Sequence, residues 1–267
     1  NVHDALRYLL SASVRRGVHD QRHSEGATMK WLRTLVIFDR GAVVSSSDWK
    51  KIHESYIRSI QSIDFPKGTG LLKLRRKFKR PDGQWNRNGV VYLKRRFLDD
   101  MVKKEKWRAE VGFDLGKNRQ PVEVNLYPSL ESHREPITSD FGDFDLVTTT
   151  STGMRVAIEW ETGNISSSHR SMNKLAIALR TGKIQVGVLI VPSRDLYEHL
   201  TDRIGNISEL SGYLSMWKDL EARVDRGLLA ITVVEHDQLT GDSRFRYLPV
   251  GEDGRARRRE AEHVCGR

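Results

Sequence analysis

A pair of glutamates, Glu159 and Glu161, stands in the stretch of the chain whose residues are best suited to chemistry. Val156, Ile158 and Trp160 alternate with other residues at the period of a half-buried β-strand, so both carboxylates project from the opposite face. Side chains two positions apart on a strand are roughly 7 Å from each other. Like charges this close need a cation or water between them. A divalent cation, which prefers hard oxygen ligands, would meet that need and can promote phosphodiester hydrolysis.

The residues directly after this strand predict a helix over residues 165–180. Thr162-Gly163-Asn164 ends the strand, and Asn164 or a nearby serine is placed to cap the helix. Ser166 and Arg170 share the polar face of the helix. The apolar positions recur at helical spacing: Ile165, Met172, Leu175, Ala176 and Leu179. An acidic strand end therefore leads into a polar helix start.

The composition favours an acidic partner. The formal net charge is +10 with a pI near 9.8, and 30% of the residues are charged. No apolar run approaches the roughly 18 residues that a membrane-spanning helix requires, so nucleic acid fits the charge better than a membrane does. Cys265 is the single cysteine, which excludes an internal disulfide framework and predicts a cytoplasmic protein.

The run from Ile158 to Lys174, I-E-W-E-T-G-N-I-S-S-S-H-R-S-M-N-K, resembles the BamHI-type restriction endonucleases, which carry E-F-E-T-G-N-I-S-S-A-H-R-S-M-N-K-L. Two further segments are similar to the same family. Asn88-Gly-Val-Val91 precedes Trp107 and Glu110 at the spacing of the family, and Leu200-Thr-Asp-Arg-Ile204 corresponds to its L-T-D-R-V. The resemblance implies an α/β fold with a restriction-endonuclease-like core, a central mixed β-sheet flanked by helices.

The resemblance assigns catalysis to four carboxylates, those of Glu110, Asp145, Glu159 and Glu161. It places Mg²⁺ on Glu110, Asp145, Glu159 and the main-chain carbonyl of Trp160. Asp145 fits the sequence context of the central metal-binding aspartate better than Asp143 does. The distance to the glutamate pair is nevertheless shorter here than in the family, so both aspartates remain candidates. Many relatives in the wider nuclease superfamily carry lysine at the position of Glu161. A glutamate cannot act as a fixed cation, so the expected role of Glu161 is to orient or deprotonate the attacking water.

The resemblance also supplies a set of DNA-binding residues. Asn164, Ser166, Arg170, Asp202 and Arg203 match the base-contacting residues of the family, and asparagine, serine and arginine can distinguish base edges in the major groove. Lys94 falls at a family lysine near DNA. The match predicts cleavage of double-stranded DNA at a palindromic hexamer of the GGATCC type, after the first guanine, with a 5′ overhang. A palindrome read by identical halves implies a two-fold homodimer, with residues 165–180 and the segment after 204 at its interface.

Three regions divide the chain. We expect a flexible extension over residues 1–28, because Met29 resembles a start; a single endonuclease domain over 29–250; and a basic tail over 251–267. Within the domain, the patterns predict strands in residues 31–44, 122–127, 140–147, 154–161, 184–192 and 228–234. They predict helices at residues 48–62, 91–106, 165–180 and 207–224, and a further helix after Ser193. Residues 128–139 are expected to form a loop. Lys73–Arg80 contains six cations and is either a solvated strand edge or a phosphate-contacting element.

Two other functions fit parts of the sequence. A DNA-binding protein without cleavage activity would keep the base-contacting residues, but the complete set of acids argues against it. A glycosidase could use Glu159 and Glu161 as acid and nucleophile, yet two carboxylates on one strand do not flank a sugar from opposite sides. The excess of positive charge would also be unexplained.

Overall fold

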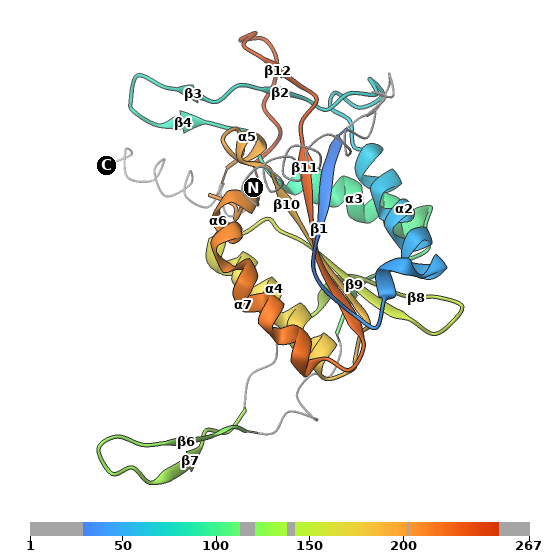
Figure 1. The fold of residues 1–267 in the computed structure, drawn as a ribbon. Coiled ribbons are helices and arrows are strands. Elements are labelled where there is room, and N and C mark those ends of the chain that lie inside the picture. Colours follow the sequence, from blue (N-terminus) through green and yellow to red (C-terminus); the bar gives the residue numbers. More distant parts are fainter. Residues whose placement is uncertain (1–28, 113–120, 138–141, 202, 251–267) are drawn as a thin grey trace, which may run out of the picture.

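A six-stranded mixed sheet forms the centre of the computed structural model, which describes residues 29–112, 121–137, 142–201 and 203–250 (Figure 1). The strand order is β1-β11-β10-β9-β8-β5. The strands are β1 (Lys30–Arg40), β5 (Arg108–Val111), β8 (Phe144–Thr149), β9 (Arg155–Trp160), β10 (Val186–Pro192) and β11 (Gly227–Glu235). β9, β10 and β11 run parallel, and the other neighbours pair antiparallel. The predicted α/β fold with a central mixed sheet is confirmed.

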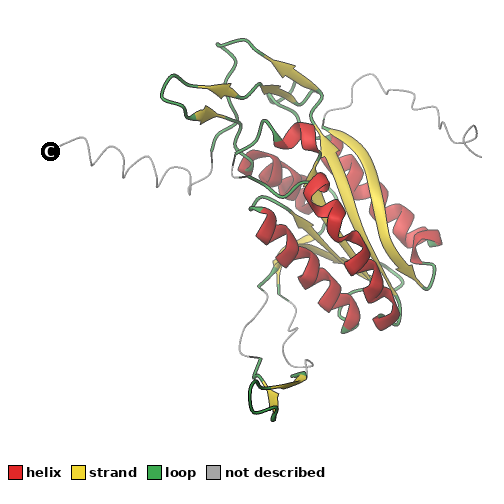
Figure 2. Ribbon diagram, turned by 60° about the vertical axis from the view of Figure 1, so that its left-hand side comes forward, coloured by secondary structure: helices red, strands yellow, loops and turns green. Residues whose placement is uncertain are grey.

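Helices cover both faces of this sheet (Figure 2). One layer contains α2 (Ser47–Gln61) and α3 (Val91–Lys103), and the other contains α4 (Ile165–Arg180), α6 (Ile207–Leu210) and α7 (Leu214–Lys218). Short α5 (Arg194–Tyr197) follows β10, and the 3-10 turns are η1 (Val43–Ser45), η2 (Ser211–Tyr213) and η3 (Asp219–Arg223). No helix among the described residues is long and apolar enough to cross a membrane.

The alternation along β9 places its side chains in two separate cores. Val156, Ile158 and Trp160 pack with the residues of α2 and α3, whereas Ala157 packs with those of α4. The predicted alternation is therefore correct, but the expectation of a half-buried strand is wrong. The strand is buried on both faces because parallel strands in the middle of a sheet carry helices on each side.

Small strands extend the fold beyond the central sheet. β2 (Lys73–Arg75) pairs with β12 (Gln238–Thr240), β3 (Phe78–Lys79) pairs with β4 (Trp85–Asn86), and β6 (Glu123–Asn125) pairs with β7 (Ser132–Arg134). The strand β7 lies within the stretch that we expected to be a loop. The predicted helix over residues 207–224 is divided into short pieces, and Gly212 lies at the break, where glycine disfavours a continuous helix.

Candidate active site

Asp145 and Glu159 stand side by side where β8 and β9 pair. Leu146 faces Ile158 in this antiparallel pair, which puts Asp145 across from Glu159. The Asp145 carboxylate accepts a hydrogen bond from the main-chain N–H of Trp160, with Oδ2 and N 2.8 Å apart. Asp143 is exposed at the start of the strand, so Asp145 is the aspartate that the fold brings to the glutamate pair.

Two lysines balance the charge of these acids. Lys94 Nζ of α3 lies 2.7 Å from Asp145 Oδ1, and Lys174 Nζ of α4 contacts Glu159 Oε1. The side chains of Lys174 and Glu159 are each only 8% exposed. Burial, and then repulsion from Asp145, raise the pKa of Glu159 to about 7, while Lys174 acts in the opposite direction. The carboxylate is therefore poised between its two protonation states near neutral pH.

Glu161 completes the acidic strand end and is fixed by the turn that follows it. Its Oε1 accepts a hydrogen bond from the N–H of Gly163 at 2.5 Å, and burial raises the pKa of Glu161. A Cβ on Gly163 would lie 2.4 Å from Ser167 Oγ and 3.1 Å from Glu161 Oε1. Only glycine leaves room for the turn, so this residue determines how closely the acidic strand approaches the start of α4.

Glu110 lies on the neighbouring strand β5. Ala109 faces Leu146 and Val111 faces Phe144, so Glu110 stands across from Asp145. Glu110 is exposed and has φ of +51°, a left-handed conformation that is strained for a residue with a side chain. Among the described residues, no three carboxylate, histidine or cysteine side chains gather as a metal cage. Glu110 is thus near the acids in the sheet but does not form a three-carboxylate cluster with them.

The oxygen donors at the strand ends nevertheless fit a divalent cation. Asp145 and Glu159 offer hard carboxylate oxygens, and their mutual repulsion is the electrostatic condition that a bound cation relieves. The main chain of Trp160 lies beside Asp145 through the hydrogen bond from its N–H. Glu110, Asp145, Glu159 and Trp160 are therefore adjacent in the sheet, although lysine ammonium groups now neutralise two of the acids.

Lys174 contacts Glu159 in the candidate site, although the sequence analysis did not single it out. It lies within the buried stripe of α4, between Met172 and Leu175, where a lysine is exceptional. Its Nζ also donates to the main-chain oxygen of Asp143 at 2.7 Å and lies 4.6 Å from the ring centre of Phe144. A charged residue on the apolar face of a predicted helix was the available signal for a buried ion pair.

The candidate base-reading residues gather at the start of α4. The Asn164 side chain caps the helix by accepting from the N–H of Ser167 at 3.2 Å, as predicted. Asn164 also forms an isolated antiparallel bridge with Ile204, so exposed Arg203 is brought close to the helix start. Ser166 and Arg170 are exposed on the same helix, whereas Asp202 lies outside the described residues.

One glycine allows this second segment to approach the helix. A Cβ on Gly205 would lie 1.8 Å from Ser168 Oγ and 2.8 Å from Ser168 Cβ, so no larger residue fits without movement. The N–H of Gly205 donates to the carbonyl of Gly163 at 3.2 Å. The turn after β9 and the segment that carries Arg203 are therefore joined by main-chain contacts.

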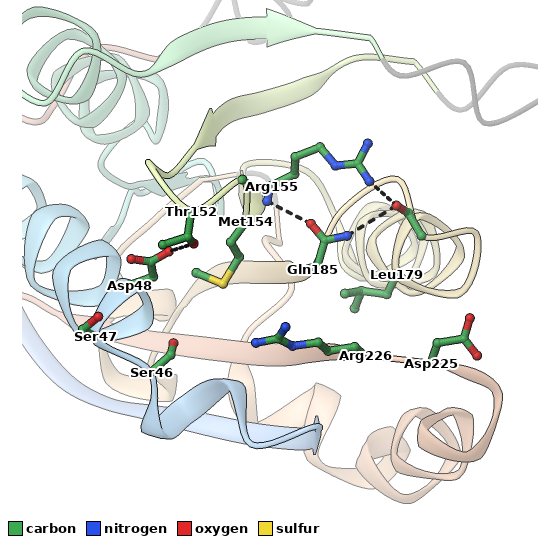
Figure 3. A pocket seen from close by; sticks show the side chains of 12 residues that line it. Ser46, Ser47, Asp48, Thr152, Met154, Arg155, Leu179, Gln185, Asp225 and Arg226 are labelled. Carbon is green, nitrogen blue, oxygen red and sulfur yellow. Dashed lines mark hydrogen bonds between the residues drawn. The ribbon is translucent and has the colours of Figure 1, made fainter.

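A separate pocket of about 750 Å³ opens at the other end of the sheet (Figure 3). Its lining includes Asp48, Arg155 and Arg226, and none of the predicted site residues. Arg155 begins β9 and Glu159 lies near its end, so the pocket and the acids are at opposite ends of one strand. This pocket is therefore not part of the candidate active site.

A mixed α/β sheet with acids at its strand ends, next to an exposed polar helix start, defines a protein with a restriction-endonuclease-like core. Comparison with protein families agrees with this class. The family model described as Restriction endonuclease BamHI matches residues 29–255. The chain belongs to the BamHI restriction endonuclease family.

Individual relatives match over shorter stretches. The chain is 48% identical over 104 residues to the type II restriction enzyme OkrAI of Oceanobacter kriegii. The matched stretch covers 39% of this chain and 52% of OkrAI. It is 48% identical over 62 residues to the type II restriction enzyme BamHI of Bacillus amyloliquefaciens, covering 23% of this chain and 29% of BamHI. The match thus spans about half or less of the length of these relatives.

A solved structure of the restriction endonuclease BglII in complex with a DNA 16-mer superposes with a TM-score of 0.45 and 10% sequence identity, covering 81% of this chain and 86% of that chain.

Proposed function

We propose that the protein is a type II restriction endonuclease that hydrolyses phosphodiester bonds of double-stranded DNA with Mg²⁺. The observation that carries the proposal is the placement of partly buried Asp145 and buried Glu159 and Glu161 beside the exposed residues that begin α4. Membership of the BamHI family supports this activity over a glycosidase.

The proposed chemistry divides the work among the acids. Glu110, Asp145, Glu159 and the Trp160 carbonyl would hold Mg²⁺, which supplies an activated water and stabilises the negative charge that develops on the phosphate. Glu161, fixed by the N–H of Gly163, is the residue that orients or deprotonates the attacking water. Lys94 and Lys174 hold the acids together before the cation binds, because they neutralise carboxylates that would otherwise repel.

The proposed target is a palindromic hexamer of the GGATCC type, cut after the first guanine. Asn164, Ser166 and Arg170 project from the helix start, and Arg203 lies close to Asn164 through the bridge of its neighbour Ile204. Asp202 belongs to the same proposed set. Amide, hydroxyl and guanidinium groups of this kind distinguish base edges in the major groove. A two-fold homodimer would present two such sets to the two halves of the palindrome.

Digestion of DNA by the purified protein tests the proposal directly. Plasmid DNA is incubated with the protein in Mg²⁺ or in EDTA, and the ends of the fragments are sequenced. We expect every end to carry the same four-base overhang of a cut hexamer in Mg²⁺, and intact plasmid in EDTA. Specific binding without cutting in Mg²⁺ would identify a DNA-binding protein instead, and ends without a common sequence would refute the proposed specificity.

A further inference from the structure

A strongly basic segment lies outside the acids and the base-reading residues. We call residues 73–88, which contain β2, β3 and β4, the basic arm. The arm holds seven lysines and arginines and one aspartate, Asp82, so it supplies +6 of the net charge of +10. Self-repulsion at this density opposes a compact arrangement unless an anionic partner is present.

Aromatic rings hold the cations of the basic arm in place. Arg75 lies 4.6 Å from the ring centre of Tyr247, and Lys73 lies 5.6 Å from that of Phe245. On the hairpin of β3 and β4, Lys77 and Arg87 lie 5.7 and 5.8 Å from the ring centre of exposed Trp85. Contacts of this kind position a charged group while leaving its charge in place.

The basic arm is fastened to the segment that carries Arg203. The N–H of Asn88, a fully buried residue, donates to the carbonyl of His199 at 2.8 Å, and Thr201 N–H donates to the Asn88 carbonyl at 2.8 Å. Lys77 adds an ion pair with Glu198 at 2.6 Å. Figure 1 shows the arm beside α5, at the end of the sheet from which this segment leaves. A surface that contacts DNA through Arg203 is therefore continuous with the arm.

Some exposed cations of the basic arm are not neutralised by carboxylates of the described residues. Within the described part of the chain, Lys77 pairs with Glu198 and Arg80 pairs with Asp82. Arg76 and Lys79 are exposed, and no carboxylate of a described residue forms an ion pair with them. An ordered row of cations with few carboxylates is the electrostatic surface that a phosphate backbone requires.

We infer that the basic arm binds the phosphate backbone of duplex DNA outside the recognition hexamer. The inference rests on the proposed function, because DNA held by Arg203 is what brings the flanking phosphates to the arm. Contacts to phosphates set position and affinity without reading sequence. The DNA that the protein occupies is thus longer than the sequence it recognises.

Binding to duplexes of two lengths tests the inference. One duplex ends just outside the hexamer, and the other adds about one helical turn of flank on each side. Affinity is measured in EDTA for the wild-type protein, for R76Q/K79Q and for K50Q/K51Q, a control that removes two exposed lysines of α2. We expect R76Q/K79Q to lose affinity for the long duplex and keep it for the short one. Each lost phosphate contact lowers the salt dependence, and a two-fold dimer presents two arms to the two flanks. The slope on the long duplex should therefore fall by about 4.

The outcomes separate this inference from the proposed function. Equal affinity of wild type and R76Q/K79Q for the long duplex, or an equal loss on both duplexes, overturns the role of the arm. Failure of the wild-type protein to prefer the hexamer over a scrambled site overturns the proposed specificity, while the arm still predicts weaker binding of R76Q/K79Q to any long duplex. Loss of binding to phosphatidylserine vesicles, with long-duplex binding retained, would assign the arm to a membrane surface and refute the inference.

Discussion

The buried ammonium of Lys174 favours the ionised form of the Glu159 carboxylate. Both side chains are removed from water, and a buried carboxylate without a partner becomes neutral or destabilises the fold. A divalent cation at the strand end would favour the ionised form, because it offers a second positive charge to a group whose pKa is about 7. Lysine and cation therefore act on the same carboxylate in the same direction.

Glu159→Gln should abolish cleavage and leave specific binding intact. The amide keeps the shape of the side chain but cannot supply an ionised oxygen to Mg²⁺. We expect cleavage in Mg²⁺ to fall below detection, while the affinity for a duplex containing the hexamer changes little. Glu54→Gln, which alters an exposed carboxylate of α2, serves as the control and should cut like the wild type. A Glu159→Gln protein that still cuts would remove Glu159 from the metal site.

Lys174→Met should be destabilising, and less so when Glu159 is also replaced. The single substitution leaves a buried carboxylate beside Asp145 without its counter-charge, which costs about 3–5 kcal/mol of the free energy of unfolding. In Glu159→Gln/Lys174→Met both charges are absent, so the two losses should not add. Urea denaturation of the wild type, the two single variants and the double variant, at about one pH unit above the pKa of Glu159, gives their four free energies of unfolding. These four values form a double-mutant cycle. Strict additivity would show that the ion pair contributes nothing to stability.

At the scale of elements, the turn after β9 and the segment before α6 form one unit at the start of α4. Gly163 and Gly205 are hydrogen-bonded to each other through the main chain, and each lies against a serine of α4. The reading helix is therefore positioned from two sides, by the strand that carries the acids and by the segment that carries Arg203. Base contact and phosphate chemistry are linked through these close approaches.

Gly205→Ala should weaken binding to the hexamer. The added methyl group would lie 2.8 Å from Ser168 Cβ, so the segment or the helix must shift, and overpacking of this kind costs about 1–3 kcal/mol. We expect lower affinity for the hexamer duplex and a smaller difference from a scrambled duplex. In Gly241→Ala, outside the proposed dimer segment, the new Cβ meets nothing within 4 Å, so this control should bind like the wild type. Equal behaviour of the two variants would show that Gly205 does not hold the reading segment in place.

The sequence predicts these elements most reliably where a single pattern determines the fold. The alternation of β9, the cap at Asn164 and the apolar stripe of α4 depend on neighbouring residues, and each is found as predicted. The burial of β9 and the pairing of Lys174 with Glu159 depend on contacts between distant segments, which no local pattern contains. The break of the helix over residues 207–224 shows that an apolar stripe alone does not exclude an interruption at Gly212.

At the scale of the whole molecule, the basic arm and the proposed dimer segment after residue 204 lie on different elements. The basic arm and the reading residues lie at one end of the sheet, where DNA is proposed to bind. The segment after residue 204 instead packs aromatic side chains against α4: His169 lies 4.3 Å from Tyr213, measured between ring centres, and the indole N–H of Trp217 donates to Asn173 at 3.2 Å. The proposed contact of this segment with a second copy therefore does not involve the basic arm.

Met216→Glu should disrupt the proposed homodimer. Tyr213 and Met216 are 45% and 50% exposed, and they lie in the segment after residue 204 where we expect the two-fold interface. In a two-fold interface each substitution acts twice, so one new carboxylate per chain places two charges in the buried contact. Analytical ultracentrifugation should give about twice the chain mass of 30.7 kDa for the wild type and the chain mass itself for Met216→Glu.

The same variant connects assembly to cleavage, because two strands of a palindrome need two copies of the active site. We expect Met216→Glu to lose conversion of a plasmid with a single hexamer to its linear form. Val102→Glu, which changes a residue of α3 that is 38% exposed, is the matched control and should remain dimeric and active. A Met216→Glu protein that stays dimeric would place the interface elsewhere. A wild-type protein that linearises the plasmid while its mass stays that of one chain would refute the two-fold arrangement itself.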